Sequence, residues 1–195
     1  MSQPYKKMTI EELVVLSQQD DLKALEELIR KIQHDVYATL SYMLNNYENI
    51  HDLTQEVLLK VARHIQDLKS PKCFNGWLNH IITNTYYDTL RKIKRKPQIV
   101  SLEYTCAPLN LEIKFDIPDK SSKPIEKCIT SECEKFIQKA IRGLPEAFKI
   151  AIILREFQGL SYEEIANTTN SSIGTVKSRI SRARIKLQEV LKSYI

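Results

Sequence analysis

Apolar residues at helical spacing fill two stretches of this chain, and a proline-marked segment separates them. The first stretch covers about residues 9–96 and the second about residues 128–195. Residues 97–127 hold four of the seven prolines and show no helical period. The chain also has only four glycines, fewer than the turns of an all-β domain usually need. The sequence therefore predicts an all-α protein in which a flexible linker joins two small helical domains.

Capping signals and prolines mark where the helices of both domains are expected to begin and end. Thr9–Glu12 and Ser131–Glu134 have the spacing of a capping box, in which the first and fourth residues satisfy each other's backbone N–H groups. The first domain is expected to contain four helices, the third over about 49–65 with an Asn cap and the fourth over about 74–94. In the second domain a helix is expected over about 145–159, with a proline in its first turn.

Residues 161–184 have the layout of a helix-turn-helix. Ser161–Glu164 is another capping-box sequence, and it opens a short helix. A polar turn of Asn, Thr and Ser follows, and either Ser171 or Ser172 is expected to cap a longer, basic helix. A short helix, a tight turn and a longer basic helix together are typical of modules that place the second helix in the major groove of DNA.

The basic helix divides into two faces when its residues are placed about 100° apart. One face is apolar and is expected to pack in the core: Val176, Ile180, Ala183 and Leu187. The opposite face has short hydroxyls and one arginine at its centre and cations at its edges: Ser178, Ser181 and Arg182, flanked by Thr175, Arg179, Lys186, Lys177 and Arg184. The central residues can reach base edges while the flanking cations bind phosphates. A solvated basic helix is the alternative for the charges alone.

The third predicted helix also has two different faces. Its apolar stripe consists of Leu53, Val57, Val61 and Ile65. The opposite side places Leu59 among polar residues: Asp52, Gln55, Glu56 and Arg63. An apolar residue with a polar rim is typical of a protein-contact surface, although single exposed leucines are also common. The residues alone leave both interpretations open.

The fourth predicted helix combines an aromatic residue with cations. Its predicted core stripe is Phe74, Trp77, Leu78, Ile81 and Thr85, and its far side holds His80, Thr83, Tyr87, Arg91 and Lys94, with Asn84 at the edge. Residues 91–96 contain five cations in six positions. Base stacking on an aromatic side chain stabilises single-stranded DNA by about 1–3 kcal/mol. Tyr87 or Tyr86 is therefore expected to help hold an unstacked base.

These segments, in this order, resemble the compact two-domain sigma factors of the extracytoplasmic-function type, also called group IV. The first domain matches at Asp52–Val61 and Phe74–Leu78, with Ile81, Asn84, Asp88, Arg91 and Lys92. The second domain matches at Leu144–Glu146, Arg155–Glu156, Gly159–Ala166 and Gly174–Arg179. The resemblance covers nearly the whole chain. It implies a region 2 domain over 1–96, a linker over 97–127 that passes the RNA exit region of the polymerase, and a region 4 domain over 128–195.

The resemblance also assigns roles to residues. The clamp helices of core RNA polymerase should be bound by Asp52, Gln55, Glu56 and Leu59. The downstream (minus-ten) promoter element should be read and opened by Lys69, Lys72, His80, Asn84, Tyr87, Arg91 and Lys94, with Asn84 and the loop 69–73 capturing a flipped base. The upstream (minus-thirty-five) element should be met by Thr175, Lys177, Ser178, Arg179, Ser181, Arg182 and Arg184. The polymerase flap and an anti-sigma factor are further expected partners.

Other functions receive less support from the sequence. The net charge of +5 suits an anionic partner but does not identify one. The four cysteines and four histidines have no metal-ligand spacing, and neither a phosphate-binding loop nor a nucleophile–base pair is apparent, so no catalysis, metal or cofactor is expected. A free-standing repressor or activator would explain the helix-turn-helix but would leave Leu59 and Tyr87 without a role.

The expected location follows from the apolar runs. The first 19 residues lack the apolar stretch of a secretory signal. The most apolar stretch elsewhere, Ile150–Leu154, is far shorter than the roughly 20 residues that cross a bilayer. A cytoplasmic protein without membrane insertion is therefore expected.

Overall fold

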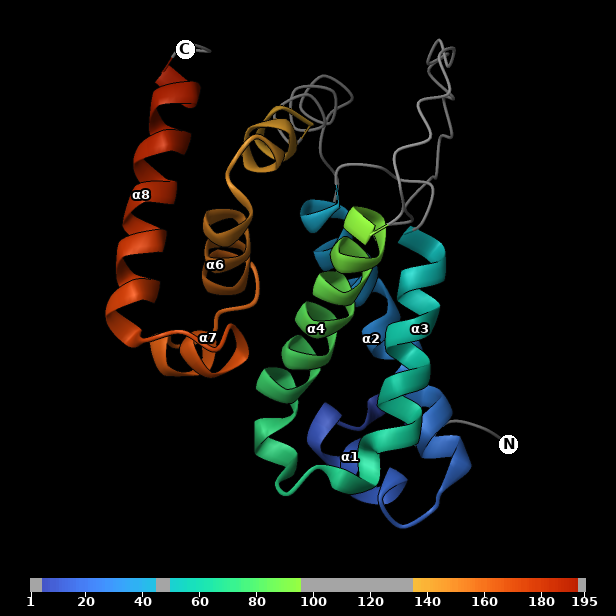
Figure 1. Ribbon diagram of the computed structural model, residues 1–195. Helices are drawn as coiled ribbons and strands as arrows, with labels where there is room; N and C mark the ends of the chain where they lie inside the picture. The colour runs from blue at the N-terminus through green and yellow to red at the C-terminus, as the bar shows by residue number, and fades with distance from the viewer. Residues whose placement is uncertain (1–4, 45–49, 96–134, 193–195) are drawn as a thin grey trace, which may run out of the picture.

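The computed structural model describes residues 5–44, 50–95 and 135–192, and in these ranges the chain is built of helices without strands (Figure 1). This confirms the all-α prediction. The predicted linker 97–127, the Asn cap at residue 49 and the capping box Ser131–Glu134 lie outside the described residues.

The first helical unit contains four α-helices: α1 (Ile10–Ser17), α2 (Leu22–Met43), α3 (Ile50–His64) and α4 (Phe74–Arg95). Short 3₁₀ turns lie at Tyr5–Lys7, Ile65–Asp67 and Pro71–Cys73. Helix α2 packs against both α1 and α3, and α3 packs against α4. One core therefore runs through the unit, with fully buried residues that include Leu13, Leu28, Leu40, Met43, Val57 and Val61.

Local capping signals fix the beginnings of the first two helices. At α1 the predicted capping box is present: Glu12 N donates to Thr9 Oγ1 at 3.2 Å, and Thr9 N donates to Glu12 Oε2 at 2.7 Å. At α2 the carboxylate of Asp21 accepts hydrogen bonds from Lys23 N and Ala24 N at 3.0 and 3.1 Å. Each cap satisfies backbone N–H groups that have no partner within the helix.

The predicted apolar stripe of α3 is confirmed, because Leu53, Val57, Val61 and Ile65 are all buried. The prediction for α4 was only partly right. Phe74, Leu78 and Thr85 are buried, but Trp77 and Ile81 are half-exposed. The buried residues instead include Ile82 and three polar ones that the stripe omits: Asn79, Thr83 and Tyr86.

Helix α4 departs from the prediction because it is covered on two sides. One side packs against α2 and α3, and another packs against α7 (Tyr162–Thr168) of the second helical unit. The assignment of helix faces at about 100° per residue assumes that only one side of the helix is covered. That assumption placed Thr83 on the exposed side, whereas Thr83 is completely buried in the structure.

The second helical unit contains helical residues 135–142, α6 (Glu146–Glu156), α7 (Tyr162–Thr168) and α8 (Ile173–Lys192). Helix α8 packs along α6 and α7, and the buried apolar residues of this unit include Ile141, Ile150, Ile153, Leu154, Leu160, Ile165, Val176, Ile180 and Ala183. Pro145 is the N-cap of α6 rather than part of its first turn, a shift of one position from the prediction. Gly159 has a φ of +67° in the turn after α6, a conformation that glycine adopts without strain.

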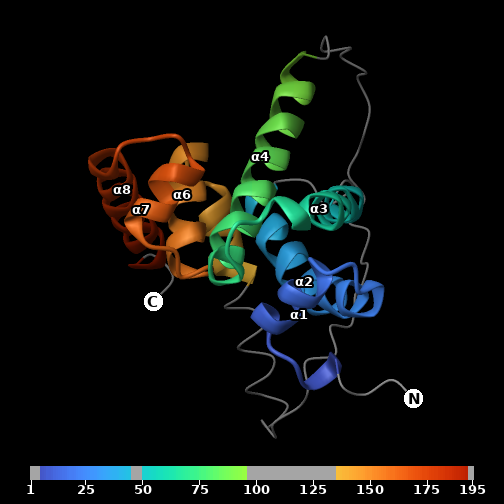
Figure 2. The ribbon, with the colours of Figure 1, turned by 90° about the horizontal axis from the view of Figure 1, so that it is seen from below.

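The two units lie against each other. Helix α7 contacts α4, and α6 contacts α2, as the two perpendicular views show (Figures 1 and 2). The buried apolar residues of the two units form one hydrophobic cluster.

Among the described residues, no helix combines the length and the apolar composition that spanning a bilayer demands.

Candidate nucleic-acid interface

The predicted helix-turn-helix is formed by α7, a tight turn and α8. The capping box at its start is present, with Glu164 N donating to Ser161 Oγ at 3.2 Å and Ser161 N donating to Glu164 Oε2 at 2.8 Å. In the turn, Asn170 adopts a left-handed φ of +47°, which Asn tolerates better than most residues. Ser172 caps α8, because its Oγ accepts a hydrogen bond from Thr175 N at 3.1 Å. This decides between Ser171 and Ser172 in favour of the latter.

Helix α8 has the two faces that its periodicity predicts. Val176, Ile180 and Ala183 are buried, and Leu187 packs half-buried at the end of the stripe. The opposite face is exposed and consists of Lys177, Ser178, Ser181 and Arg182. Short side chains and one guanidinium therefore line an open helical face, which has the form required for reading base edges in a major groove.

The flanking arginines of α8 are already engaged with protein groups. Arg179 is half-buried and donates from Nη1 to Ser171 Oγ at 2.8 Å. Arg184 donates from Nε and Nη2 to the same Glu156 oxygen, Oε1, at 3.1 and 2.6 Å, and this raises the pKa of Arg184. Both residues therefore help to hold the helix-turn-helix together. The sequence alone gave no indication of these partners.

An aromatic ring with two cations lies beside the exposed face of α8. The guanidinium carbon of Arg155 is 4.8 Å from the ring centre of Tyr162, and Lys177 Nζ is 5.6 Å from it. Arg155 also donates to the backbone oxygen of Leu160 at 2.7 Å. Cation–π contacts of this kind restrain long basic side chains. The sequence analysis missed Tyr162 and Arg155, and only their place in the matched family segments could have indicated them.

Helix α4 has its predicted polar surface only in part. His80, Asn84 and Arg91 are exposed, and Asn84 Nδ2 lies 3.2 and 3.3 Å from the two ring nitrogens of His80. Arg91 pairs with Asp88 at 2.9 Å. Lys69 and Lys72 are exposed on the loop before α4. The side chain of Lys94, the last of the seven residues predicted for this surface, lies outside the described ones.

The two tyrosines of α4 have different environments. Tyr86 is buried, and its hydroxyl donates to Met43 O at 3.0 Å and to Glu146 Oε2. The suggestion that Tyr86 holds an unstacked base is therefore wrong, because its ring has no access to DNA. Tyr87 is half-buried, and burial raises its pKa while the charge of Arg179 acts against that rise. Tyr87 is thus the remaining aromatic candidate.

The predicted protein-contact face of α3 is exposed. Leu59 is 54% exposed, and Asp52 and Gln55 beside it are also exposed. Glu56 forms an ion pair with Lys60 at 2.8 Å. Next to Leu59 lies a shallow hollow that is lined by Ile29, Gln55, Leu58, Leu59 and Ala62. An apolar centre with a charged rim is therefore present on this surface.

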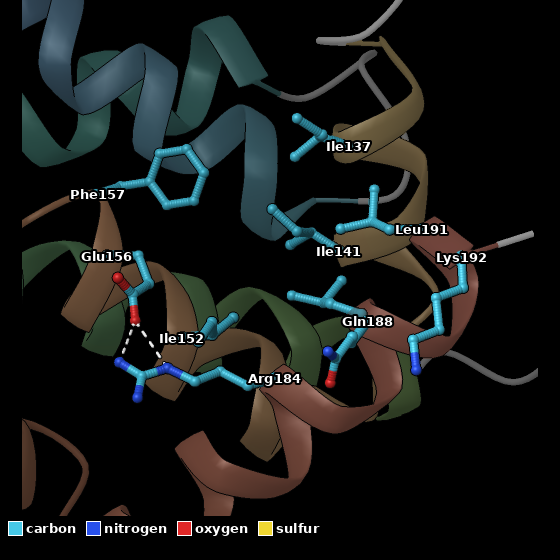
Figure 3. A pocket seen from close by; sticks show the side chains of 10 residues that line it. Ile137, Ile141, Ile152, Glu156, Phe157, Arg184, Gln188, Leu191 and Lys192 are labelled. Atoms are coloured by element: carbon cyan, nitrogen blue, oxygen red, sulfur yellow. Dashed lines mark hydrogen bonds and ion pairs between the residues drawn. The ribbon is translucent and has the colours of Figure 1, made fainter. Parts of the chain in front are cut away.

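A second apolar surface was not predicted from the sequence. An open groove of about 680 Å³ runs between residues 137–141, α6 and α8 (Figure 3). Its apolar lining consists of Ile137, Ile141, Ile152, Phe157, Leu187 and Leu191, and the Glu156–Arg184 pair lies at its edge. Because three separate segments form it, only their packing reveals the groove.

Two family models match the chain, and together they cover both helical units. The model for Sigma-70 region 2 matches residues 28–96, and the model for Sigma-70 region 4 matches residues 137–187. The second range contains the whole helix-turn-helix described above.

Curated relatives match over nearly the full length. The ECF RNA polymerase sigma-E factor of Haemophilus influenzae is 34% identical over 188 residues, which are 96% of this chain and 97% of the relative. The RNA polymerase sigma-H factor of Pseudomonas aeruginosa is 31% identical over 186 residues, which are 93% of each chain.

A solved structure has the same arrangement of helices. The sigma factor RpoE of Bartonella quintana, crystallised with the anti-sigma factor NepR, matches with a TM-score of 0.67 and 26% sequence identity. The match covers 88% of this chain and 98% of that one. With the helix-turn-helix, the two matched regions and the full-length relatives, the chain belongs to the extracytoplasmic-function family of sigma factors, the subunits that direct RNA polymerase to promoters.

Proposed function

We propose that this sigma factor reads an upstream promoter element with α8 and a downstream element with α4 and the loop before it, while α3 holds the core polymerase. The observation that carries this proposal is the exposed face of α8, where Lys177, Ser178, Ser181 and Arg182 lie opposite a buried apolar stripe. A helix with this division can enter a major groove without disturbing its own core.

Upstream recognition rests on the chemistry of that face. Arg182 is the central guanidinium, and a guanidinium binds the O6 and N7 acceptors of guanine in a bidentate manner. Ser178 and Ser181 are short enough to let the helix approach the bases. Lys177, Lys186 and Arg155, which lies over the ring of Tyr162, supply contacts to phosphates, which position the helix without reading sequence.

Downstream recognition uses the exposed side of α4. Asn84 and His80 provide hydrogen-bonding groups, Tyr87 provides an aromatic ring, and Lys69 and Lys72 provide positive charge nearby in the chain. Extruding a base from duplex DNA costs a few kcal/mol, and stacking on one aromatic side chain returns about 1–3 kcal/mol. Tyr87 therefore helps to hold an opened base but does not melt the duplex unaided.

Polymerase binding is assigned to the α3 face. Leu59 supplies an exposed apolar anchor, and Asp52, Gln55 and Glu56 supply the polar rim. The sigma factor itself catalyses no reaction in this proposal: it positions the polymerase, needs no cofactor and acts in the cytoplasm where the polymerase transcribes. Interfaces of this kind draw most of their affinity from a few central residues.

The groove beside α8 is assigned to protein partners. Its apolar lining suits the apolar face of an amphipathic helix. The polymerase flap is one proposed occupant, and an anti-sigma factor is another. The Bartonella quintana relative, which was crystallised with the anti-sigma factor NepR, supports the second assignment.

The decisive experiment combines binding and transcription. Purified core RNA polymerase is mixed with this chain and assayed on a library of genomic promoter fragments. The proposal expects stoichiometric binding and new start sites that share two spaced elements. If the chain did not bind the polymerase but bound specific DNA duplexes alone, the proposal would be wrong. The chain would then be a free-standing DNA-binding regulator.

A further inference from the structure

Ile185 extends the exposed face of α8 by one helical turn beyond Ser181 and Arg182. It follows Ser181 by four positions and Arg182 by three, and residues at these spacings lie on the same side of a helix. Its side chain is 53% exposed, whereas the apolar stripe on the opposite side of α8 is buried. Ile185 therefore lies outside the core, on the side of α8 that carries the groups proposed to contact DNA.

The residues beside Ile185 repeat an arrangement that occurs two turns earlier in α8. Residues 177–179 are Lys, Ser and Arg, and residues 184–186 are Arg, Ile and Lys. At about 100° per residue, two positions seven apart differ in direction by only about 20°. Ile185 therefore points in almost the same direction as Ser178, and two cations flank the central side chain in each triplet. Cations in such flanking positions suit phosphates, and the side chain between them faces the bases.

The apolar groove lies on a different side of α8, which contributes to it Arg184, Leu187, Gln188, Leu191 and Lys192. Leu187 points about 160° away from Ile185 around the helix. A protein bound in the groove would therefore lie away from Ile185. Single exposed isoleucines are common on protein surfaces, but Ile185 stands between two cations on the longer helix of a DNA-binding module.

The major groove of DNA offers an apolar group to a side chain of this kind. Each thymine places its C5-methyl group there, beside the hydrogen-bond donors and acceptors of the base edges. The side chain of isoleucine has no hydrogen-bonding group, and its contact with a methyl group removes apolar surface of both from water. The rise from Arg182 to Ile185 is about 4.5 Å, a little more than the rise of one base pair, so the two residues can meet bases within about two base pairs of each other.

We propose that Ile185 is a further specificity-determining residue, which contacts the C5-methyl group of a thymine in the upstream promoter element. This thymine lies within about two base pairs of the base that Arg182 contacts. The inference rests on the function proposed above, since it requires α8 to enter the major groove. It adds recognition of an apolar base substituent to the hydrogen-bonding groups of the same face.

The test removes the methyl group from the DNA and the isoleucine side chain from the protein. Deoxyuridine in place of thymidine lacks only the C5-methyl group and forms the same base pair. Each thymine of the upstream element, on either strand, is replaced in turn, and the affinity of the reconstituted holoenzyme for each duplex is measured. With the wild type we expect one replacement to lower the affinity about fourfold, the effect of burying one methyl group. Ile185→Ala should bind the thymine duplex more weakly than the wild type and should bind the thymine and uracil duplexes equally well.

Two further variants of α8 serve as controls. Ile185→Val keeps a branched apolar side chain and should keep most of the difference between thymine and uracil. Val190 is another exposed aliphatic residue, about 140° from Ile185 around the helix, and Val190→Ala should keep the whole difference. Because both side chains are exposed, all of these variants should fold, and circular dichroism checks that they do.

Three results would overturn the proposal: an upstream element without a thymine near the base that Arg182 contacts, wild-type binding that no uracil changes, or a uracil effect of the same size in Ile185→Ala. The proposed function has its own readout in the same assay. A wild-type holoenzyme that bound no promoter would contradict that function and this inference together. Promoter binding that was indifferent to the methyl group would contradict only the role of Ile185.

Discussion

The hydroxyl of Tyr86 donates a hydrogen bond to the carboxylate of Glu146, 60 residues further along the chain. Tyr86 is 1% exposed, and burial and the nearby carboxylate raise its pKa. Tyr86, which the sequence analysis offered beside Tyr87 as a residue that holds an unstacked base, therefore connects the two helical units instead. Of these two neighbours on α4, Tyr86 contacts the second helical unit, and Tyr87 is the one that we propose contacts DNA.

Arg182→Ala should remove a preference for one particular base in the upstream element. We expect a loss of about 1–3 kcal/mol on promoters with the preferred base and little change on promoters that lack it. Binding of the holoenzyme to a set of single-base promoter variants measures this. Lys186→Ala is the control, because a phosphate contact weakens all sequences equally and reduces the salt dependence. An equal loss on every variant for Arg182→Ala would assign that residue to phosphate.

Leu59→Glu should abolish binding to core polymerase while leaving the fold intact. The side chain is 54% exposed, so the substitution buries no charge in the isolated protein but places one at the centre of the proposed contact. Leu22→Glu is the matched control, since Leu22 is 77% exposed at the start of α2 in the same unit. Co-purification with core polymerase gives the result. Undiminished binding of Leu59→Glu would remove the α3 face from the interface.

Tyr87→Leu should weaken binding to single-stranded DNA of the downstream element by about 1–3 kcal/mol, because stacking is lost while most of the apolar contact is kept. Tyr87→Phe keeps the ring and should bind nearly as well as the wild type. Holoenzyme binding to a fork-junction template, with the non-template strand exposed, measures the difference. If both variants lost affinity equally, the hydroxyl rather than the ring would carry the contact.

Acid should weaken the start of α2 through Asp21. Hydrogen bonds from Ala24 N, the Tyr5 hydroxyl and Lys23 N favour the charged carboxylate and hold the pKa of Asp21 below its usual value of about 3.9. This stabilisation is present above that usual value and is lost as the pH falls through the lower folded pKa.

Asp21→Asn keeps a good N-cap but cannot titrate, so its stability should fall less than that of the wild type between pH 5 and about pH 2. Chemical denaturation at several pH values provides the comparison. Parallel curves for the two proteins would show that Asp21 has the same pKa in the folded and unfolded states.

The parts of the fold that local chemistry determines could be predicted from the sequence. The capping boxes at Thr9 and Ser161 depend on residues three apart, and the stripes of α3 and α8 depend on helical period alone. The structure has all four features.

The parts that depend on docking between distant segments could not be predicted. Asn79 and Thr83 look like surface residues of α4, yet both are fully buried in the structure. Gln158 forms hydrogen bonds with Asn79 and Thr39, which are 79 and 119 positions away, and no period in the sequence encodes such a pair. The groove likewise needs three segments to be packed before its lining becomes continuous.

Arg184 belongs to two surfaces at once. Its guanidinium is exposed at the edge of α8, on the flank of the face proposed to read DNA, and the residue also lines the groove, where it pairs with Glu156. A DNA phosphate and a protein occupant of the groove would therefore draw on the same side chain. By thermodynamic linkage, each of these two ligands would change the binding affinity of the other by the same factor. A single ion pair can thus couple the affinity of this sigma factor for DNA to the binding of a protein in the groove.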